Sequence, residues 1–403
     1  MPASSVLSAA IWATIAAAPP GTAPATAPSV DLDELRRQAA PLIDKAMKYF
    51  VANQASDSGW PGIALLGSDP AITSLITLTF IQHPNYGPHH ETTRRAIRLI
   101  LKFQQPDGGI YSPYVGFQNY TTSIALTTLA AAKDDSLADA VGQAQQWLKA
   151  NQWTEDKTDN TDKPVTEAHP WYGGAGYGGK KQRPDLSNTQ MMIEALHASG
   201  LPADDPTYKR AIKFIERCQM SSSTNDQPFA RGATDGGFIY SPANDGESKA
   251  GTCDDQGTAR LRSYGSMTYA GFKSMLYAHA ARSDARVQQA WNWIRGHYTL
   301  KENPNMPGKQ SLQGLYYYYH VFAKALAAWG EPFIVDPKGT AHNWRRDLIE
   351  ELRKRQRDDG TWINSADRWH EGNANLVTAY AVLALQAAMK EDAKPPMKAE
   401  GRR

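Results

Sequence analysis

The chain has 403 residues, and its 43 Lys and Arg against 41 Asp and Glu give a formal net charge of +2. This balance provides no broad basic surface for nucleic acid or anionic lipid, so neither is expected as a partner. No apolar run approaches the roughly 18 residues that cross a bilayer. The length would suit two or three domains, but an internal repeat overrides that estimate because repeated units share one core.

Residues 1–30 differ in composition from the rest of the chain. Val6–Ala18 is small and apolar, and a tether rich in Pro, Ala and Thr follows it. This pattern is typical of a secretory signal and predicts an exported protein, periplasmic or extracellular. The first basic residue is Arg36, so the positive region expected before the apolar run is missing, and a disordered cytoplasmic tail is the alternative. Residues 391–403 predict a disordered basic tail.

A ten-residue pattern recurs six times. Five copies end in Gln, five carry Ala at the second position, and most have a large apolar pair at the fifth and sixth. This spacing predicts an amphipathic helix with one buried face. The copies are residues 45–54, 95–104, 143–152, 210–219, 289–298 and 347–356.

A second and more apolar helix is predicted after each copy. Each of these segments contains a Thr, Ser or Tyr followed by small residues interleaved with Leu or Met, and they begin near residues 71, 121, 188, 266, 318 and 376. A helix that is apolar on most sides is buried, while its amphipathic partner faces solvent on one side. Six pairs predict an all-α (α/α)6 toroid, an inner apolar ring inside an outer amphipathic ring, as a single domain over residues 31–390.

Two segments resemble known repeat families. Gln356–Trp362 matches the glutamine–tryptophan repeat of squalene and oxidosqualene cyclases, and Gln104–Ile110 matches it except for the terminal Trp. The segment from Arg217 through Gly236–Phe238 to Ala270–Gly271 is similar to the β-subunit pattern of protein prenyltransferases. The resemblance covers almost the whole chain after the leader. It implies the toroid fold strongly and the reaction weakly, since one fold hosts many chemistries.

Neither family's reactive motif is complete. Squalene-cyclase-like proteins use an Asp-x-Asp-Asp acid, and the nearest match, Thr252–Asp255, is expected in a solvated loop, whereas an acid that protonates an alkene must be buried. In the prenyltransferase alignment, Arg262 and Tyr264 replace the Asp and Cys zinc ligands, and only His320 matches. One ligand of three does not hold zinc, so no metal and no cofactor is predicted.

The two cysteines leave alternatives open. A bridge between Cys218 and Cys253 would stabilise an exported protein by roughly 3–4 kcal/mol, less any strain, and free buried thiols are the alternative. Cys253 and Gln256 also have the spacing of the thioester in complement-type proteins. The flanking sequence does not match those proteins, and Asp255 stands where they carry Glu.

Candidate site residues lie where the inner helices begin. These N-termini converge at one mouth of a toroid, and their free N–H groups favour polar or anionic ligands there. His320 is a candidate general acid or base, with a satisfied core histidine as the alternative. The tyrosines at 316–319 span more than one helix face, so at least one should reach the cavity. The catalytic candidates are His320, Tyr319, Asp185 and Asp235, and the ligand-binding candidates are Tyr264, Asn188, Tyr316, Tyr317, Trp171, Arg262 and Arg368.

Two long insertions, residues 153–186 and 220–263, could cover that mouth. Loops of this length are usually functional lids or disordered. Trp171, Tyr172 and Tyr177 lie among glycines. They favour an ordered lid whose aromatic faces would meet a hydrophobic or sugar ligand.

Three functions remain open for a chain that is expected to be monomeric. The first is a cyclase-like or prenyltransferase-like protein that binds an isoprenoid or other apolar ligand, because aromatic faces stabilise carbocations. The second is an exported carbohydrate-active enzyme, a lyase or hydrolase acting on a glycan. It needs convergent groups, drawn from Asp185, Asp235, Arg262, Arg368 and Glu371. The third is a non-catalytic extracellular binding module.

Overall fold

The computed structural model describes residues 30–62, 67–178, 183–255 and 257–391. The compact unit described below begins at Leu32. The expected leader (residues 1–29) and nearly all of the expected basic tail (392–403) lie outside the described residues. None of the helices found in the described part of the chain is both long and apolar enough to span a bilayer.

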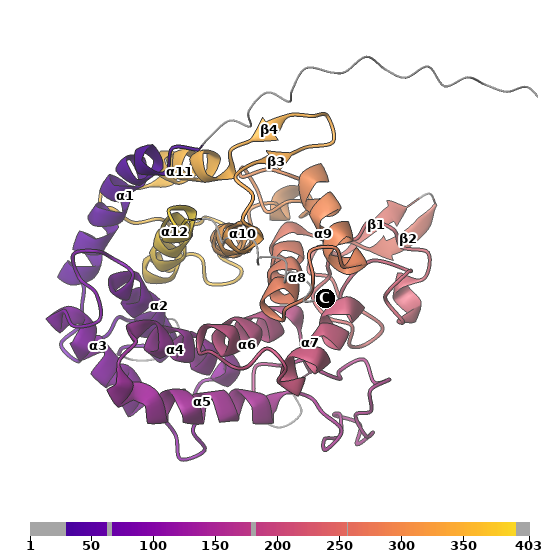
Figure 1. The fold of residues 1–403 in the computed structure, drawn as a ribbon, viewed down its shortest axis with the longest axis horizontal. Coiled ribbons are helices and arrows are strands. Elements are labelled where there is room, and N and C mark those ends of the chain that lie inside the picture. The colour runs from indigo at the N-terminus through magenta and orange to yellow at the C-terminus, as the bar shows by residue number, and fades with distance from the viewer. Residues whose placement is uncertain (1–29, 63–66, 179–182, 256, 392–403) are drawn as a thin grey trace, which may run out of the picture. The chain divides into compact units, whose positions relative to one another are not determined.

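Twelve α-helices in the described residues of this unit form two concentric rings (Figure 1). The outer helices are α1 (Leu32–Ala52), α3 (Glu91–Lys102), α5 (Ala138–Asn151), α7 (Pro206–Arg217), α9 (Ala285–Gly296) and α11 (Trp344–Arg355). The inner helices are α2 (Pro70–Ile81), α4 (Gln118–Ala132), α6 (Leu186–Ala198), α8 (Gly265–Tyr277), α10 (Leu315–Trp329) and α12 (Ala374–Ala388). Successive inner helices pack on one another, and α12 packs on α2, which closes the ring. The predicted all-α toroid is confirmed.

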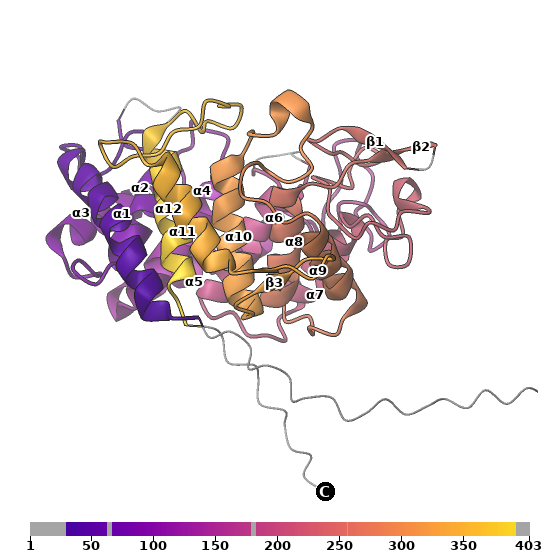
Figure 2. The ribbon, with the colours of Figure 1, turned by 90° about the horizontal axis from the view of Figure 1, so that it is seen from above.

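Burial explains why the two kinds of helix separate. In α12, every residue from Leu376 to Ala388 is buried, whereas α3 buries only one face, which includes Ala96, Ile97 and Ile100. Because apolar surface gains free energy when it leaves water, the helix that is apolar all round takes the inner place. The helices of both rings run across the thickness of the ring (Figure 2).

The repeated Gln ties neighbouring repeats together. The Gln356 side-chain amide donates to the carbonyl of Gly360 in its own turn at 3.0 Å and to that of Leu42 in α1 at 2.8 Å. Gln152 and Gln219 make the same pair of bonds, to their own turn and to the next outer helix. The Gln356 bond joins the last repeat to the first, so this motif is part of the architecture.

The Gly and Trp of the same motif also have structural roles. Gly360 has φ +88°, and a Cβ there would stand 2.6 Å from the carbonyl oxygen of Lys45, so only glycine fits against α1. The indole N–H of Trp362 donates to the carbonyl of Leu352 at 2.8 Å, and its backbone N–H donates to the Thr378 hydroxyl. The turn therefore joins an outer helix to the following inner helix.

In the fifth repeat, tyrosines hold the turn between the outer and the inner helix. Tyr298, which stands in place of Gln, donates its hydroxyl to Asp347 at 2.7 Å. Tyr318 and Tyr319 donate theirs to the carbonyls of Thr299 and Leu300, in the loop after α9. Two of the four consecutive tyrosines are thus used to hold this turn.

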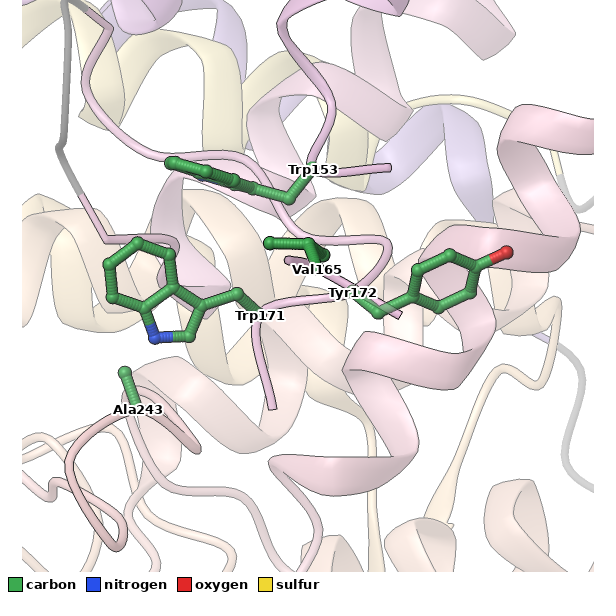
Figure 3. Close-up of a cluster of buried hydrophobic side chains, with 5 residues drawn as sticks. All are labelled: Trp153, Val165, Trp171, Tyr172 and Ala243. Carbon is green, nitrogen blue, oxygen red and sulfur yellow. The ribbon is translucent and has the colours of Figure 1, made fainter. Parts of the chain in front are cut away.

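The first long insertion forms a small core of its own. Trp153, Val165, Trp171 and Tyr172 pack together with Ala243 from the second insertion (Figure 3). The rings of Trp153 and Trp171 meet edge to face with centroids 4.8 Å apart. Trp171 is 3% exposed, so the structure uses it for packing and does not present it to a ligand.

Strands are few in the described residues. The second insertion contains the hairpin of β1 (Thr252–Asp255) and β2 (Thr258–Leu261), and β3 (Ile334–Val335) pairs with β4 (Ala341–His342) before α11. Thr252–Asp255 is therefore a strand, where the sequence suggested a loop. Cys218 is buried and Cys253 is partly exposed, and both are free thiols, so the disulfide alternative is wrong. Gln256, the other residue of the thioester pattern, lies outside the described residues.

Candidate functional site

A cavity of about 280 Å³ lies where the inner helices begin. Its lining comes from the first turns of all six inner helices, together with the loops that precede them. The inner N-termini therefore converge at one end of the ring. Most of the wall is apolar, as ligand pockets usually are, and the aliphatic and Met side chains are Ile72, Leu75, Val115, Ile124, Met267 and Leu376.

Tyrosines supply most of the aromatic lining. Burial raises the pKa of each phenol, so all remain neutral at ordinary pH. Their ring faces can stabilise a positive charge in the cavity, and their hydroxyls can form hydrogen bonds. The six are Tyr120, Tyr177, Tyr240, Tyr264, Tyr317 and Tyr380.

A chain of polar groups runs along part of this wall. The Tyr317 hydroxyl lies 2.9 Å from the Ser187 hydroxyl and accepts a hydrogen bond from the Gln190 amide at 3.1 Å. Ser187 is also hydrogen-bonded to the Tyr120 hydroxyl. Residues from α4, α6 and α10 thus share one network, which can position a polar group of a ligand.

Glu371 is the most unusual ionisable group in the cavity. It is 1% exposed, and its two carboxyl oxygens accept hydrogen bonds from the backbone N–H of Tyr317 at 2.8 Å and from the Asn364 amide at 2.6 Å. Burial raises the pKa of Glu371 to about 7, against the lowering by these hydrogen bonds. A carboxyl group that keeps its proton near neutral pH in an apolar cavity can act as a general acid.

Two aspartates cap inner helices nearby. Asp69, which lines the cavity, accepts from the backbone N–H groups of Ala71 and Ile72 at the start of α2, and burial raises its pKa. Asp185 accepts from the backbone and side chain of Asn188 at the start of α6, and burial raises its pKa to about 6. Both carboxylates thus satisfy free helix N–H groups.

The structure brings some of the sequence candidates to the cavity. Tyr264 and Tyr317 line it, as does Glu371 from the carbohydrate-enzyme set. Asp185 and Asn188 lie at the start of α6 beside the lining residue Ser187, and the Asn188 side chain accepts from the Asn119 amide at 3.1 Å. The Arg368 guanidinium lies 5.3 Å from the ring of Trp369, which lines the mouth.

Other candidates lie elsewhere. Tyr316 is buried with its ring edge-on to Tyr319 at 5.5 Å, and the Tyr319 hydroxyl holds the loop after α9. Asp235 accepts from Ser263 and from the backbone of Gly237 in the turn before α8. Arg262 donates to the Thr252 carbonyl beside the β1–β2 hairpin. These side chains do not reach the cavity because each is already held by packing or by hydrogen bonds in a turn.

His320 is buried one helical turn beyond Tyr317. Its ring packs on Tyr380 at 5.2 Å, and its Nδ1 has no hydrogen-bond partner within the described part of the chain. Burial holds the pKa of His320 well below its usual range, with further lowering from Lys324. It is therefore a neutral group behind the cavity wall, close to a set of buried charges on α6, α8 and α10.

Sequence reasoning missed several lining residues. Tyr120 could have been found, because it stands three residues after the N-terminal cap of α4, as Tyr317 does in α10. Tyr240, Lys249 and Trp369 come from loops whose path no local pattern predicts.

Comparison with known proteins agrees with the toroid fold. Residues 64–240 match the family model of the squalene-hopene cyclase C-terminal domain. The resemblance to the squalene cyclase repeat family is confirmed, and the chain is a terpene-cyclase-like α/α toroid with an aromatic central cavity. A search of curated protein sequences finds no match.

Solved structures share the fold at low identity. The type II terpene cyclase MstE from Scytonema, in complex with its substrate geranylgeranyl dihydroxybenzoate, has a TM-score of 0.56 and 13% identity, covering 89% of this chain and 99% of that chain. An α-1,6-mannanase of Salegentibacter sp., in complex with α-1,6-mannotriose, has a TM-score of 0.54 and 8% identity, covering 89% and 99%. A family 76 glycoside hydrolase from a bovine Bacteroides thetaiotaomicron strain has a TM-score of 0.53 and 10% identity, covering 86% of this chain and 78% of that chain. These identities show the fold alone.

Proposed function

We propose that this protein binds an isoprenoid or similar apolar ligand in the central cavity and cyclises it by acid catalysis, with Glu371 as the proton donor. The observation that carries the proposal is a buried carboxyl group, with its pKa raised to about 7, in a cavity walled by tyrosine rings. The resemblance to terpene cyclases in sequence and fold supports the same ligand class.

The step balances without a cofactor. The Glu371 proton adds to one carbon of a trisubstituted alkene, whose π bond breaks to leave a tertiary carbocation and a carboxylate. A second alkene of the same ligand attacks that cation and forms the new carbon–carbon bond. The final cation then loses a proton to a base, which restores the proton count. Tyrosine faces around the cavity would stabilise each cation.

The cavity limits the size of the ligand. A volume of about 280 Å³ lies just below the range of roughly 300–1,000 Å³ for small-molecule sites. A compact isoprenoid of two or three units is therefore the better fit, and a long polyprenyl chain would extend through the mouth.

The test uses the purified full chain with geraniol and farnesol in D₂O. Acid-catalysed cyclisation would place one deuterium from solvent in the cyclic product, which mass spectrometry detects. Glu371→Gln keeps the side-chain shape but removes the acid, so product formation should stop while farnesol still binds. Absence of both farnesol binding and cyclic product would overturn the proposal, and binding without any product would leave a non-catalytic binding module.

Two carboxylates in one cavity support a second candidate. Glu371 and Asp69 both line it, as does Trp369, and a pair of carboxyl groups is what glycoside hydrolysis uses. Release of reducing sugar from an α-mannan, lost in both Glu371→Gln and Asp69→Asn, would favour this function over the first. Export from the cytoplasm is proposed with either function, from the composition of the leader. Fractionation of cells that express the full chain would test it.

A further inference from the structure

Only one of the two carboxyl oxygens of Asp69 is used by the protein. Its Oδ1 accepts hydrogen bonds from the backbone N–H groups of Ala71 at 2.8 Å and Ile72 at 3.1 Å, which caps α2. Its Oδ2 accepts no hydrogen bond from any residue that the structure describes. The side chain is half-buried and lines the cavity. One oxygen thus holds the helix, and the other keeps its lone pairs unused.

The Asp69 carboxyl group is fixed from two sides. The two N–H bonds come from the first turn of α2, where the helix dipole favours a negative charge. A Cβ at Gly62 would stand 2.5 Å from Oδ2, so a glycine is needed beside this oxygen. Burial raises the pKa of Asp69, against the lowering by the two N–H bonds. A carboxylate that is held rigidly and is more basic than in water is suited to accept a proton.

The other polar groups of the lining are less suited to that role. Lys249 is a cation that already donates a hydrogen bond. His370 is exposed to solvent, and the neutral hydroxyl groups of the wall are weak proton acceptors. Both oxygens of Glu371 already accept hydrogen bonds. Asp69 therefore carries the unused carboxyl oxygen among the described residues of the lining.

The proposed acid and Asp69 lie at different points of the inner ring. Glu371 contacts the start of α10, whereas Asp69 caps α2. Helix α12 packs on both α10 and α2 and stands between them (Figure 1). Cyclisation moves the positive charge along the ligand, away from the carbon that took the proton. A base at another point of the wall suits that displacement.

We infer that Asp69 is a second catalytic residue, the base that takes the proton from the final carbocation. The C–H bond beside the cation breaks, its electron pair becomes the π bond of the product alkene, and the proton passes to Oδ2. Water at the mouth then removes this proton from Asp69 and returns one to Glu371, so the overall reaction is an isomerisation. This inference rests on the proposed cyclisation and assigns the base that the reaction requires.

The experiment separates formation of the cation from its loss of a proton. Asp69→Asn keeps the helix cap, since Asn caps as well as Asp, but its amide oxygen is far less basic. The natural full chain and the variant are incubated with farnesol in D₂O, and mass spectrometry identifies the cyclic products. The variant should still consume farnesol and incorporate one deuterium. Its ratio of cyclic alkene to cyclic alcohol should fall by about 10²-fold, a usual contribution of a positioned base, because water then captures the cation.

Asp205→Asn is the matched control. Asp205 caps the outer helix α7 and, like Asp69, is followed by a proline at the first helical position. This variant changes the same kind of cap outside the cavity lining, so it should keep the natural product ratio. Asp69→Ser also caps α2, through its hydroxyl, and repeats the test if the asparagine variant does not fold.

The outcomes distinguish this inference from the proposed function. An unchanged product ratio in Asp69→Asn overturns this inference alone. The same holds if the folded variant leaves farnesol unconsumed, or if the natural chain releases only the cyclic alcohol. Absence of any cyclic product from the natural chain overturns the proposed cyclisation and this inference together.

Discussion

The two ends of the inner ring are built from the same six helices and differ in what fills them. At the N-terminal end, the tyrosines and apolar side chains leave a cavity of about 280 Å³. In the C-terminal half, the two oxygens of Glu194 on α6 accept hydrogen bonds from Lys273 on α8 and Lys324 on α10. The N-terminal end has space for a ligand, whereas the charged side chains of the C-terminal half pair with one another.

This difference shows how a toroid separates function from stability. Lys273 is fully buried and Glu194 is 6% exposed, so each charge depends on its partner in a medium of low dielectric constant. Glu371, at the other end, is equally buried but has no cation bonded to it in the described residues and keeps its proton more readily. The same residue type is thus a structural ion at one end and a candidate acid at the other.

The largest expected effect is on chemistry at the cavity. Glu371→Gln should lower the rate of product formation by about 10²–10⁴-fold, the usual contribution of a positioned general acid. Its thermal unfolding should change far less, because the amide can still accept from Tyr317. Steady-state turnover together with calorimetry would check both, and a variant with normal turnover would remove Glu371 from the mechanism.

The next effect is on stability at the far end. Glu194→Gln leaves the buried ammonium of Lys273 and the partly buried ammonium of Lys324 without a counter-charge and should lower the free energy of unfolding by about 3–5 kcal/mol. The matched control is Glu91→Gln, which loses a surface pair with Arg98 and should cost less than about 1 kcal/mol. Urea denaturation measures both. Similar losses in the two variants would mean that the buried cluster contributes no more than a surface pair.

The two ends should also respond to pH in opposite directions. Burial raises the pKa of Glu371 from 4.5 to about 7, so its contribution, about 3 kcal/mol, is complete below pH 4.5 and lost as pH rises to 7. Lys273 and Lys324 hold the pKa of Glu194 well below its usual range, so its contribution is present above pH 4.5 and lost in acid. The stability gap between the natural chain and Glu371→Gln should therefore shrink as pH rises from 4.5 to 7, whereas the gap to Glu194→Gln should stay constant there and shrink only as pH falls below 4.5. A parallel change would contradict the contrast.

The smallest expected effect is that of removing one hydroxyl from either of two adjacent tyrosines. Tyr317→Phe loses the bonds with Ser187 and Gln190, and Tyr318→Phe loses its bond to the Thr299 carbonyl. Each should cost about 1 kcal/mol of stability. Only Tyr317→Phe should alter the affinity for farnesol, because only Tyr317 lines the cavity. Equal effects of the two changes on affinity would remove the distinction.

Sequence reasoning reached the fold because its signals are local. The spacing of apolar residues around Gln152 or Gln356 predicts each outer helix by itself, and six copies imply a closed ring. It also predicted a site at the N-terminal mouth, where the cavity lies, and its candidates Tyr264 and Tyr317 line that cavity. It could not separate Tyr317 from Tyr319, since both are tyrosines in one run on one helix, and only the fold leaves Tyr317 partly exposed at the cavity while Tyr319 is buried.

The sequence by itself thus determined the helices, their pairing and their division into two rings, because each depends on periodicity within one segment. Only the tertiary structure decided which end holds a cavity and which holds charges. The Glu371 carboxyl meets the backbone of Tyr317 across 54 residues of chain, and Lys324 meets Glu194 across 130. Burial and partners at such separations set the pKa of each carboxyl group, and no local pattern contains them.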